Sequence, residues 1–330
     1  MLEAIAAADE VRYTTSPNPW VGAVVVTADG RAYSGATEPP GGRHAEVVAL
    51  ERARAAAAGL EGSTLVVTLE PCSHHGRTPP CTDALVGAGV RRVVVALEDP
   101  DPQVAGRGIA ALRAAGIDVE LGVAAAEAER QLAPYLTHRR AGRPWVTLKL
   151  AATLDGRTAA ADGSSRWITG AEARADAHLL RSEHDAVLVG AGTVRADDPE
   201  LTVRHVAGRD PLRVVLGRAP AGARVHPAVE LSGPLPEVLA DLAGRGVVTL
   251  LVEGGATVAH AFHHAGLVDR YVLYLAPALM GGSDGTPLFA GPGALNVAAL
   301  RRSRLLDVRR IGDDIRVDLA PSAVPAAVLV

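Results

Sequence analysis

The sequence has few aromatic residues and no block of basic ones. Aromatic residues make up 3% of the 330 residues, and the net charge is −4 with both signs interspersed. A protein that binds nucleic acid needs a basic surface for the phosphates, and one that stacks single-stranded bases also needs aromatic platforms. We therefore expect a small-molecule ligand and no nucleic-acid partner.

The sequence also lacks a long apolar run. None reaches the roughly 18 residues that a membrane-spanning helix needs. Residues 1–10 have no basic region followed by an apolar stretch, as a secretory signal would. We expect a cytoplasmic protein with no membrane partner.

The length of the chain suggests about two domains, and its hydrophobic share of 48% is enough for sizeable cores.

Only two cysteines occur, Cys72 and Cys81, and a His-Ala-Glu triplet precedes them. One imidazole and two thiolates suit a catalytic zinc, which takes three protein ligands and keeps a fourth position for water. The metal lowers the pKa of that water to about 7, and a carboxylate that does not bind metal can carry its proton. His44, Cys72 and Cys81 are therefore candidate zinc ligands, and Glu46 is the candidate catalytic proton carrier.

The two cysteines have other interpretations. A disulfide is disfavoured in a reducing cytosol. A structural zinc normally takes a fourth protein ligand, which His74 or His75 could supply. The chain would then be a zinc-stabilised binding or scaffold protein, and a substitution of Glu46 would do little beyond altering stability.

Residues 21–123 alternate short β-branched runs with helical stretches, which is typical of an α/β layered sheet. Strands are expected over 21–26, 64–68, 92–97 and 119–121, and helices over 45–58, 82–88 and 106–115. Several of these strands are apolar on both sides, as when helices cover both faces of a sheet. Both zinc motifs then lie where strands end and helices begin, which is where ligands bind.

A second α/β unit follows residues 141–144 (Ala-Gly-Arg-Pro), which have the composition of a linker. Strands are expected over 145–150, 186–190, 212–216, 248–253 and 270–275, with an antiparallel pair over 305–309 and 314–319. Gly254-Gly255 opens a helix over 256–265, so its backbone N–H groups could meet a phosphate, although such a turn is more often only a tight connection. No Gly-x-Gly-x-x-Gly follows a strand, so the Rossmann fingerprint is absent.

Motifs in both halves resemble one known family. Residues 17–22 (Pro-Asn-Pro-Trp-Val-Gly), the His-Ala-Glu triplet and residues 70–81 (Glu-Pro-Cys-Ser-His-His-Gly-Arg-Thr-Pro-Pro-Cys) closely resemble the deaminase half of the bacterial bifunctional riboflavin biosynthesis enzymes. Zinc nucleobase deaminases in general use the same His/Cys/Cys set. Residues 150–157, 164–169, 192–199, 201–204 and 252–257 resemble the reductase half of that family.

The resemblance implies an α/β fold and two reactions. A cytidine-deaminase-like three-layer α/β/α domain would span residues 1–142, and a dihydrofolate-reductase-like α/β domain residues 143–330. The first would use zinc-bound hydroxide to deaminate 2,5-diamino-6-(5-phosphoribosylamino)pyrimidin-4-one at C2. The second would use NADPH to reduce the ribosyl group of 5-amino-6-(5-phosphoribosylamino)uracil to ribityl. Zinc and NADPH are the implied cofactors, and the implied assembly is a homodimer through the reductase domain.

The resemblance also implies site residues. Asn18 would hold the pyrimidine ring, and Arg77 is a candidate for its phosphate. The substrate of the reductase would contact Ser165, Arg181, Leu201, Arg204 and Glu253. NADPH would contact Ala151, Trp167, Thr193, Asp197, Gly255, Ala256, Thr257, Val258, Ala259, His260 and Ala261. Without the resemblance, Arg181 and Arg204 would more often be solvated charges than phosphate clamps.

An alternative function keeps the zinc deaminase but gives it another nucleobase or nucleoside. The second half would then be a recognition module. Nicotinamide binding separates the two functions, because a recognition module would not change the fluorescence of NADPH.

Overall fold

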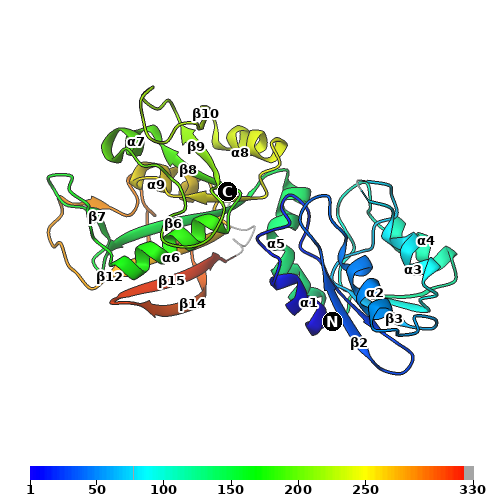
Figure 1. Cartoon of the computed structure of the whole chain (residues 1–330). Helices are drawn as coiled ribbons and strands as arrows, with labels where there is room; N and C mark the ends of the chain where they lie inside the picture. The colour runs from blue at the N-terminus through cyan, green and yellow to red at the C-terminus, as the bar shows by residue number, and fades with distance from the viewer. Residues whose placement is uncertain (77, 323–330) are drawn as a thin grey trace. The chain divides into compact units, whose positions relative to one another are not determined.

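The computed structural model describes residues 1–76 and 78–322 of the chain. The chain divides between Arg143 and Pro144 into two compact units, and both are visible in Figure 1. This division falls within the linker expected at residues 141–144, one residue beyond the end of the domain expected at 1–142. No helix in the described ranges is both long and apolar enough to span a membrane.

The N-terminal unit is built on a five-stranded mixed sheet in the order β2-β1-β3-β4-β5. Its strands are β1 (Gly22–Val26), β2 (Ala32–Ala36), β3 (Thr64–Val67), β4 (Arg92–Val95) and β5 (Asp118–Leu121), and its helices are α1 (Leu2–Asp9), α2 (Ala45–Ala55), α3 (Cys81–Gly87), α4 (Arg107–Ala114) and α5 (Ala125–Ala141). β1 runs antiparallel to β2 and β3, whereas β3, β4 and β5 are parallel. Every strand and helix expected in this half is present, but α1, β2 and α5 were not expected.

Helices cover both faces of this sheet, and two glycines show how closely. A Cβ on Gly22 would lie 1.8 Å from the carbonyl oxygen of Ala4 in α1, and a Cβ on Gly35 would lie 2.5 Å from the amide nitrogen of Ala49 in α2. Gly35 pairs with Ala23, the neighbour of Gly22 on β1. Because paired residues share a face and successive residues alternate, α1 and α2 lie on opposite faces. The unit is therefore the three-layer α/β/α sandwich expected from the sequence.

The C-terminal unit is built on an eight-stranded sheet in the order β10-β9-β8-β11-β6-β12-β15-β14, beside a small pair, β13-β7. Its strands are β6 (Trp145–Thr153), β7 (Arg157–Ala159), β8 (Ala186–Gly190), β9 (Leu212–Leu216), β10 (Val229–Leu231), β11 (Thr249–Val252), β12 (Arg270–Ala276), β13 (Thr286–Pro287), β14 (Ser303–Ile311) and β15 (Asp314–Pro321). Its helices are α6 (Ala171–Ser182), α7 (Ala191–Asp197), α8 (Leu235–Gly244) and α9 (Ala256–His264), with a short 3-10 turn at Val297–Ala299. Along the sheet, the neighbouring strands β10, β9, β8, β11, β6 and β12 run parallel to one another. β14 and β15 form the expected antiparallel pair.

Helices also cover both faces of the large sheet, as β11 shows. Leu250 and Val252 lie in a hydrophobic core together with residues of α8 and α9. Leu251, between them, lies in a second core together with residues of α6. Parallel strands that are covered on both faces are apolar throughout, which is why runs such as residues 186–190 predicted strands correctly. The unit has the layered α/β fold expected of the reductase half.

Candidate active sites

The two cysteines and His44 meet in the N-terminal unit, although the sequence separates them. His44 immediately precedes α2, Cys81 is the first residue of α3, and Cys72 lies in the loop after β3. Nδ1 of His44 lies 3.2 Å from Sγ of Cys81 and 3.5 Å from Sγ of Cys72. The three ligand atoms all lie within 4.8 Å of one another, so one ion can reach all of them.

The chemistry of this donor set fits a zinc ion. The thiol of Cys81 donates to the sulfur of Cys72, which lowers the pKa of Cys72 to about 4 despite its burial. The same contact, together with burial, raises the pKa of Cys81. Two sulfurs that share one proton beside an imidazole become two thiolates when a cation binds between them. Thiolate and imidazole ligands are those that zinc prefers.

Thr78 orients the metal-facing ring. Its Oγ1 lies 3.4 Å from Nε2 of His44, the ring nitrogen that faces away from the sulfurs. A partner on the second nitrogen fixes the tautomer and the direction of a metal-binding histidine. The sequence interpretation missed Thr78, although it lies inside the cysteine motif.

Glu46 lies in the first turn of α2, two residues after His44, and is 4% exposed. Burial raises the pKa of Glu46, and the neighbouring Cys72 raises it further. Glu46 does not belong to the group of three metal ligands. A buried carboxyl group with a raised pKa, next to a metal but not bound to it, is suited to moving a proton.

Glu70, the first residue of the cysteine motif, has a structural role. Its carboxylate accepts hydrogen bonds from the backbone N–H groups of Asp99, Gly106, Gly108 and Ile109, at 3.2, 2.9, 2.8 and 3.1 Å. These groups belong to the start of α4 and the loop before it. Glu70 therefore fixes the beginning of the metal-binding loop to α4.

We expect Glu70→Gln to destabilise the N-terminal unit by about 2–3 kcal/mol, because the new amide group would point a donor at backbone donors. Urea unfolding of the full chain measures the change, and zinc retained against a chelator measures the effect on the metal loop. Glu61→Gln is the matched control, since Glu61 is an exposed residue of the same unit. Equal stability of the two variants would contradict this role for Glu70.

The remaining expected residues of this site are less constrained. Asn18 is half-buried in the loop before β1, and its side-chain amide has no hydrogen-bond partner among the described residues. Arg77 lies outside the described residues. Neither His74 nor His75 belongs to the metal-ligand group. The described part of the chain thus supplies three protein ligands, as a catalytic zinc requires, and not the four of a structural zinc.

The second site centres on a buried ion pair in the C-terminal unit. Glu253 follows β11, and Arg181 lies near the end of α6. Arg181 donates from Nε to Oε1 of Glu253 at 2.5 Å and from Nη2 to Oε2 at 3.1 Å. Burial alone would raise the pKa of Glu253, but Arg181 and Lys149 lower it to about 2. Glu253 is therefore ionised and held rigidly by a two-point contact.

Lys149 is a candidate functional residue that the sequence interpretation missed. It lies on β6 with only 19% of its side chain exposed, and its Nζ lies 3.8 Å from Oε2 of Glu253, beyond hydrogen-bond length. Burial lowers the pKa of Lys149, and Glu253 opposes the shift. Two signals could have identified this residue. A charge interrupts an otherwise apolar strand, and the 33 Lys and Arg residues of the chain include a single lysine.

The structure places the other expected substrate residues around this pair with different roles. Arg181 Nη1 also donates to the carbonyl of Thr202 at 3.1 Å, which brings the segment 201–204 to the ion pair. Leu201 packs its side chain into the core, so only its main chain can meet a ligand. Arg204 is half-exposed and paired with Glu200.

His178 fixes this segment from α6. The backbone N–H of Arg204 donates to Nδ1 of His178 at 3.0 Å. Burial, Arg181 and Arg204 lower the pKa of His178 to about 4, so its ring is neutral and can accept this bond. Ser165 is half-buried in the loop before α6 and has no hydrogen-bond partner within the described ranges.

Two helix N-termini lie side by side where the expected cofactor residues gather. β8 and β11 are adjacent and parallel, and each leads into a helix, α7 or α9. The backbone N–H of Gly255 donates to Oγ1 of Thr193 at 3.3 Å, which joins the two helix starts. Partial positive charge at helix N-termini favours phosphate groups.

The other expected cofactor residues differ in exposure. Trp167 is 70% exposed, and Arg174 stacks on its ring at 4.6 Å. The neighbouring Arg166 donates to the carbonyl of Asp197 at 2.7 Å, which brings this loop to the end of α7. Within α9, Ala256 and Ala259 are buried, so their side chains face the protein and not a ligand. Ala151 is half-buried on β6.

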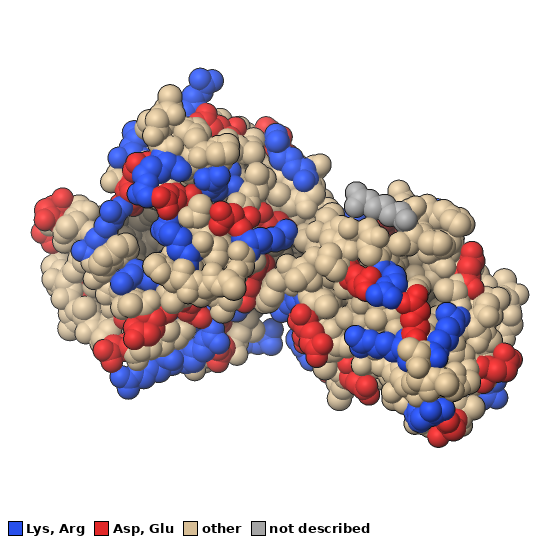
Figure 2. Space-filling view, viewed as in Figure 1, with Lys and Arg blue, Asp and Glu red and all other residues tan. Residues whose placement is uncertain are grey.

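The surface of the C-terminal unit is hollowed between α7 and β7, and basic side chains, drawn blue, lie around this hollow with some acidic ones beside them (Figure 2). Basic side chains around a concave surface attract ligands of negative charge. The hollow is thus suited to phosphate-bearing ligands.

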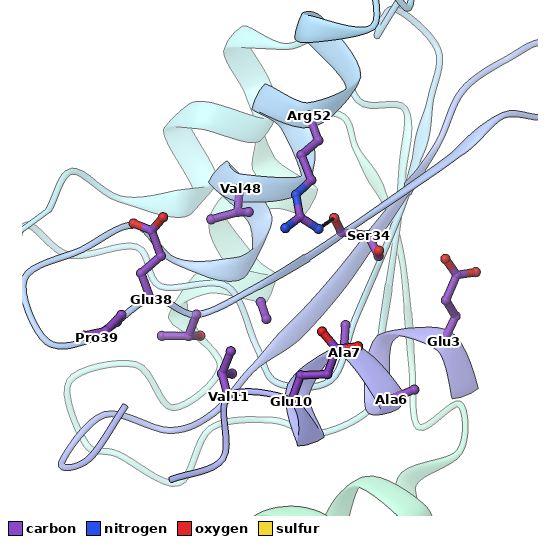
Figure 3. A pocket seen from close by; sticks show the side chains of 12 residues that line it. Glu3, Ala6, Ala7, Glu10, Val11, Ser34, Glu38, Pro39, Val48 and Arg52 are labelled. Atoms are coloured by element: carbon purple, nitrogen blue, oxygen red, sulfur yellow. Dashed lines mark hydrogen bonds between the residues drawn. The ribbon is translucent and has the colours of Figure 1, made fainter. Parts of the chain in front are cut away.

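A separate pocket of about 310 Å³ lies in the N-terminal unit between α1, β2 and α2 (Figure 3). Arg52 crosses it to donate to the carbonyl of Ser34 at 2.8 Å. Glu3, Glu10 and Glu38 contribute carboxylates to its walls. None of the three metal ligands lines this pocket, so it is distinct from the metal group.

Family models match both units. The model described as the RibD C-terminal domain matches residues 144–317, and the model described as the cytidine and deoxycytidylate deaminase zinc-binding region matches residues 1–97. The riboflavin biosynthesis protein RibD of Escherichia coli K12 is 40% identical over 362 aligned residues, which cover 97% of this chain and 98% of that protein.

Solved structures agree along nearly the whole chain. The structure of Acinetobacter baumannii RibD, form 1, gives a TM-score of 0.89 at 39% identity and covers 97% of each chain. A Thermotoga maritima protein gives a TM-score of 0.87 at 35% identity and covers 98% of this chain and 97% of its own. That protein is described as a diaminohydroxyphosphoribosylaminopyrimidine deaminase/5-amino-6-(5-phosphoribosylamino)uracil reductase.

Proposed function

Because the chain belongs to the RibD family of riboflavin biosynthesis proteins, a family of zinc deaminase–NADPH reductases, we propose which reaction each unit catalyses and which side chains carry it out. Residues 1–142 deaminate 2,5-diamino-6-(5-phosphoribosylamino)pyrimidin-4-one at C2. Residues 143–330 reduce the ribosyl group of the resulting 5-amino-6-(5-phosphoribosylamino)uracil. The description of the Thermotoga relative supports both substrates.

The observation that carries the proposal is the group His44, Cys72 and Cys81 with the buried Glu46 beside it. These three ligands would hold the zinc, which supplies Lewis-acid activation of a water molecule. Glu46 takes the proton that the water loses and returns it to the amino group that leaves C2, so one carboxyl group serves as base and then as acid. Asn18, whose side-chain amide has no partner among the described residues, is proposed to hold the pyrimidine ring, and Arg77 is proposed for the phosphate.

In the second unit, the substrate would lie against the Glu253–Arg181 pair. Arg181 and Arg204 are proposed for its phosphate, with Ser165 and the main chain of Leu201 completing the contact. NADPH supplies the hydride, which adds to C1′ of the ribosyl group. The C1′–O4′ bond breaks in this step, and the released oxygen needs a proton.

Lys149 is proposed to donate that proton. Its Nζ lies 3.8 Å from Oε2 of Glu253, beyond hydrogen-bond length, so its N–H groups are available to the substrate. Its burial beside Glu253 places it in a site from which water is largely excluded.

The cofactor would lie over the adjacent starts of α7 and α9. Thr193 and Asp197 belong to α7, and the segment from Gly255 to Ala261 covers the start of α9. Ala151 and the exposed ring of Trp167 complete the proposed contact. Fluorescence of NADPH on mixing with the protein tests this part, and an unchanged signal would favour the recognition-module alternative.

One experiment tests both reactions. The purified chain is incubated with the diaminopyrimidine phosphate, with and without NADPH, and the products are weighed by mass spectrometry. We expect the exchange of an amino group for oxygen without NADPH, and the further addition of two hydrogens only with it. Release of ammonia without any reduction in the presence of NADPH would leave only the deaminase half of the proposal.

We also propose a homodimer through the C-terminal unit, working in the cytoplasm. β14 is the edge strand of the large sheet, and its Leu305, Leu306 and Val308 side chains are exposed. An exposed apolar edge strand is a ready surface for pairing with a second copy. A reducing compartment keeps Cys72 and Cys81 as thiols that can bind metal.

We expect the Leu306→Glu/Val308→Glu variant to be monomeric at concentrations where the wild-type chain is a dimer, because buried like charges oppose pairing across the edge. Sedimentation equilibrium measures the mass of each. Leu121→Glu is the matched control, since Leu121 is exposed on β5, the edge strand of the other sheet. A variant that remains dimeric, or a wild-type monomer, would exclude β14 as the interface.

A further inference from the structure

Tyr274 lies beside Lys149 on the α6 face of the large sheet. Lys149 pairs with Val272 on β12, and Tyr274 follows two residues later, so both side chains point to the same face. Tyr274 is 1% exposed and packs with the core residues of α6. Nζ of Lys149 lies over its ring, 5.7 Å from the centroid. This distance is within the range of a cation–π contact.

The ring is fixed in place from the other side. The hydroxyl of Tyr274 donates to Oδ2 of Asp176 on α6 at 2.6 Å. Arg316 of β15 donates to the same oxygen at 2.6 Å and forms a two-point contact with Asp318 at 2.8 and 3.1 Å. A buried, fully paired network of this kind holds its members rigidly.

Lys149 needs such a support because its carboxylate neighbour is already engaged. Both oxygens of Glu253 accept from Arg181, and the ammonium is left 3.8 Å away. Arg181 is itself a cation beside Lys149, and burial further disfavours the charged form of the lysine. Among the described residues, the ammonium thus faces one shared carboxylate, one competing cation and one aromatic ring, and the guanidinium of Arg316 lies 5.8 Å from the centroid of the same ring.

We propose that Tyr274 is a positioning residue of the reductase, whose ring holds the ammonium of Lys149 charged and directed toward the substrate. This inference rests on the proposed role of Lys149 as proton donor. The negative face of the ring carries the effect, and the hydroxyl only anchors the ring to Asp176. Phenylalanine should therefore replace Tyr274 well, whereas a ring of the same shape without a negative face should not.

The test compares Tyr274→Phe with pentafluorophenylalanine at the same position and with Tyr274→Leu. We expect Tyr274→Phe to keep kcat for reduction within about threefold. We expect the fluorinated and leucine variants to lose about tenfold or more in kcat, with little change in the KM of NADPH. The fluorinated ring keeps the packing, so the test does not depend on whether Tyr274→Leu folds.

A second readout needs no substrate. Because Lys149 is the only lysine of the chain, protein labelled with ¹³C,¹⁵N-lysine gives one side-chain NMR signal, and its titration follows this ammonium alone. The titration midpoint should fall in the fluorinated variant, since the ring no longer favours the charged form. Tyr271 is the matched control on the same strand: its hydroxyl contacts His263 on the opposite face, and its fluorinated variant should change neither readout.

The outcomes separate this inference from the proposed function. A fluorinated variant with the rate and lysine titration of Tyr274→Phe would show that the ring only fills space, and would overturn the inference. A wild-type chain that fails to reduce the substrate would overturn the proposed function instead. The lysine titration would still decide whether Tyr274 acts on Lys149.

Discussion

Replacing Glu46 with glutamine should abolish deamination and leave the rest of the molecule intact. The amide keeps the size of the side chain but cannot take the proton from water, and a positioned proton carrier typically contributes about 10²–10⁴-fold to the rate. Zinc should stay bound, because Glu46 is not among the three ligands. Reduction of supplied 5-amino-6-(5-phosphoribosylamino)uracil should continue, because Lys149 and Glu253 lie in the other unit.

Ammonia release, zinc content and NADPH oxidation measure these three properties in one preparation. Glu51→Gln is the matched control, since Glu51 lies on the same helix but is half-exposed and paired with Arg43. If Glu46→Gln lost less than about fivefold in deamination at full zinc content, the carboxylate would not be the proton carrier.

Replacing Lys149 should have the opposite effect: reduction should be lost and deamination should be kept. Lys149→Met removes the ammonium at similar length, and we expect reduction to fall by about 10²–10⁴-fold, as for other proton donors. Lys149→Arg should not restore it, because a guanidinium keeps its proton at every accessible pH. Deamination and zinc content should be unchanged in both variants.

Stopped-flow oxidation of NADPH with the deaminated substrate measures the loss, and fluorescence titration checks that NADPH still binds. Arg209→Met, which removes an exposed cation paired with Asp185 in the same unit, should behave like the wild-type chain. Lys149→Met with near-normal turnover would remove the lysine from the mechanism and with it the basis of the role given to Tyr274.

The metal group could be predicted from the sequence because its chemistry is concentrated in a few uncommon residues. Two cysteines in the whole chain and one His-Ala-Glu triplet leave few choices, and soft ligands at such positions favour a metal. The motif could not show which of its residues bind the metal and which hold the metal-binding loop in place. Glu70 anchors α4, and Thr78 faces the ring of His44. Both are roles that only the folded loop defines.

Two of the elements that were missed, β2 and α5, have local sequences at odds with their structure. β2 (Ala32–Ala36) contains no β-branched residue, and its place in the sheet depends on the close approach of α2 at Gly35. α5 (Ala125–Ala141) contains Pro134, a residue that usually ends a helix. Tertiary packing determines that β2 and α5 form, and a local sequence pattern contains no information about that packing.

The reductase site was harder to read because its residues are common ones. Arg181 and Glu253 are ordinary charges in the sequence, and only their buried pairing marks them as a candidate site. The resemblance predicts ligand contacts at Leu201, Ala256 and Ala259, yet their side chains lie in the interior. A ligand contact made through the main chain does not depend on the residue type. The resemblance alone therefore could not tell whether the side chain or the backbone of a residue faces the ligand.

Because Lys149 is the only lysine and lies in the central strand β6, proteolysis at this residue can measure local opening of the large sheet. A lysine-specific endoprotease has one cleavable bond in this chain, after Lys149, and that bond lies in β6 between β11 and β12. An extended segment paired on both sides cannot enter a protease until the sheet around it separates. The rate at which the intact chain splits into two fragments would therefore measure how often this sheet opens. NADPH bound at the proposed site, where β8 and β11 lead into α7 and α9, should slow the cleavage.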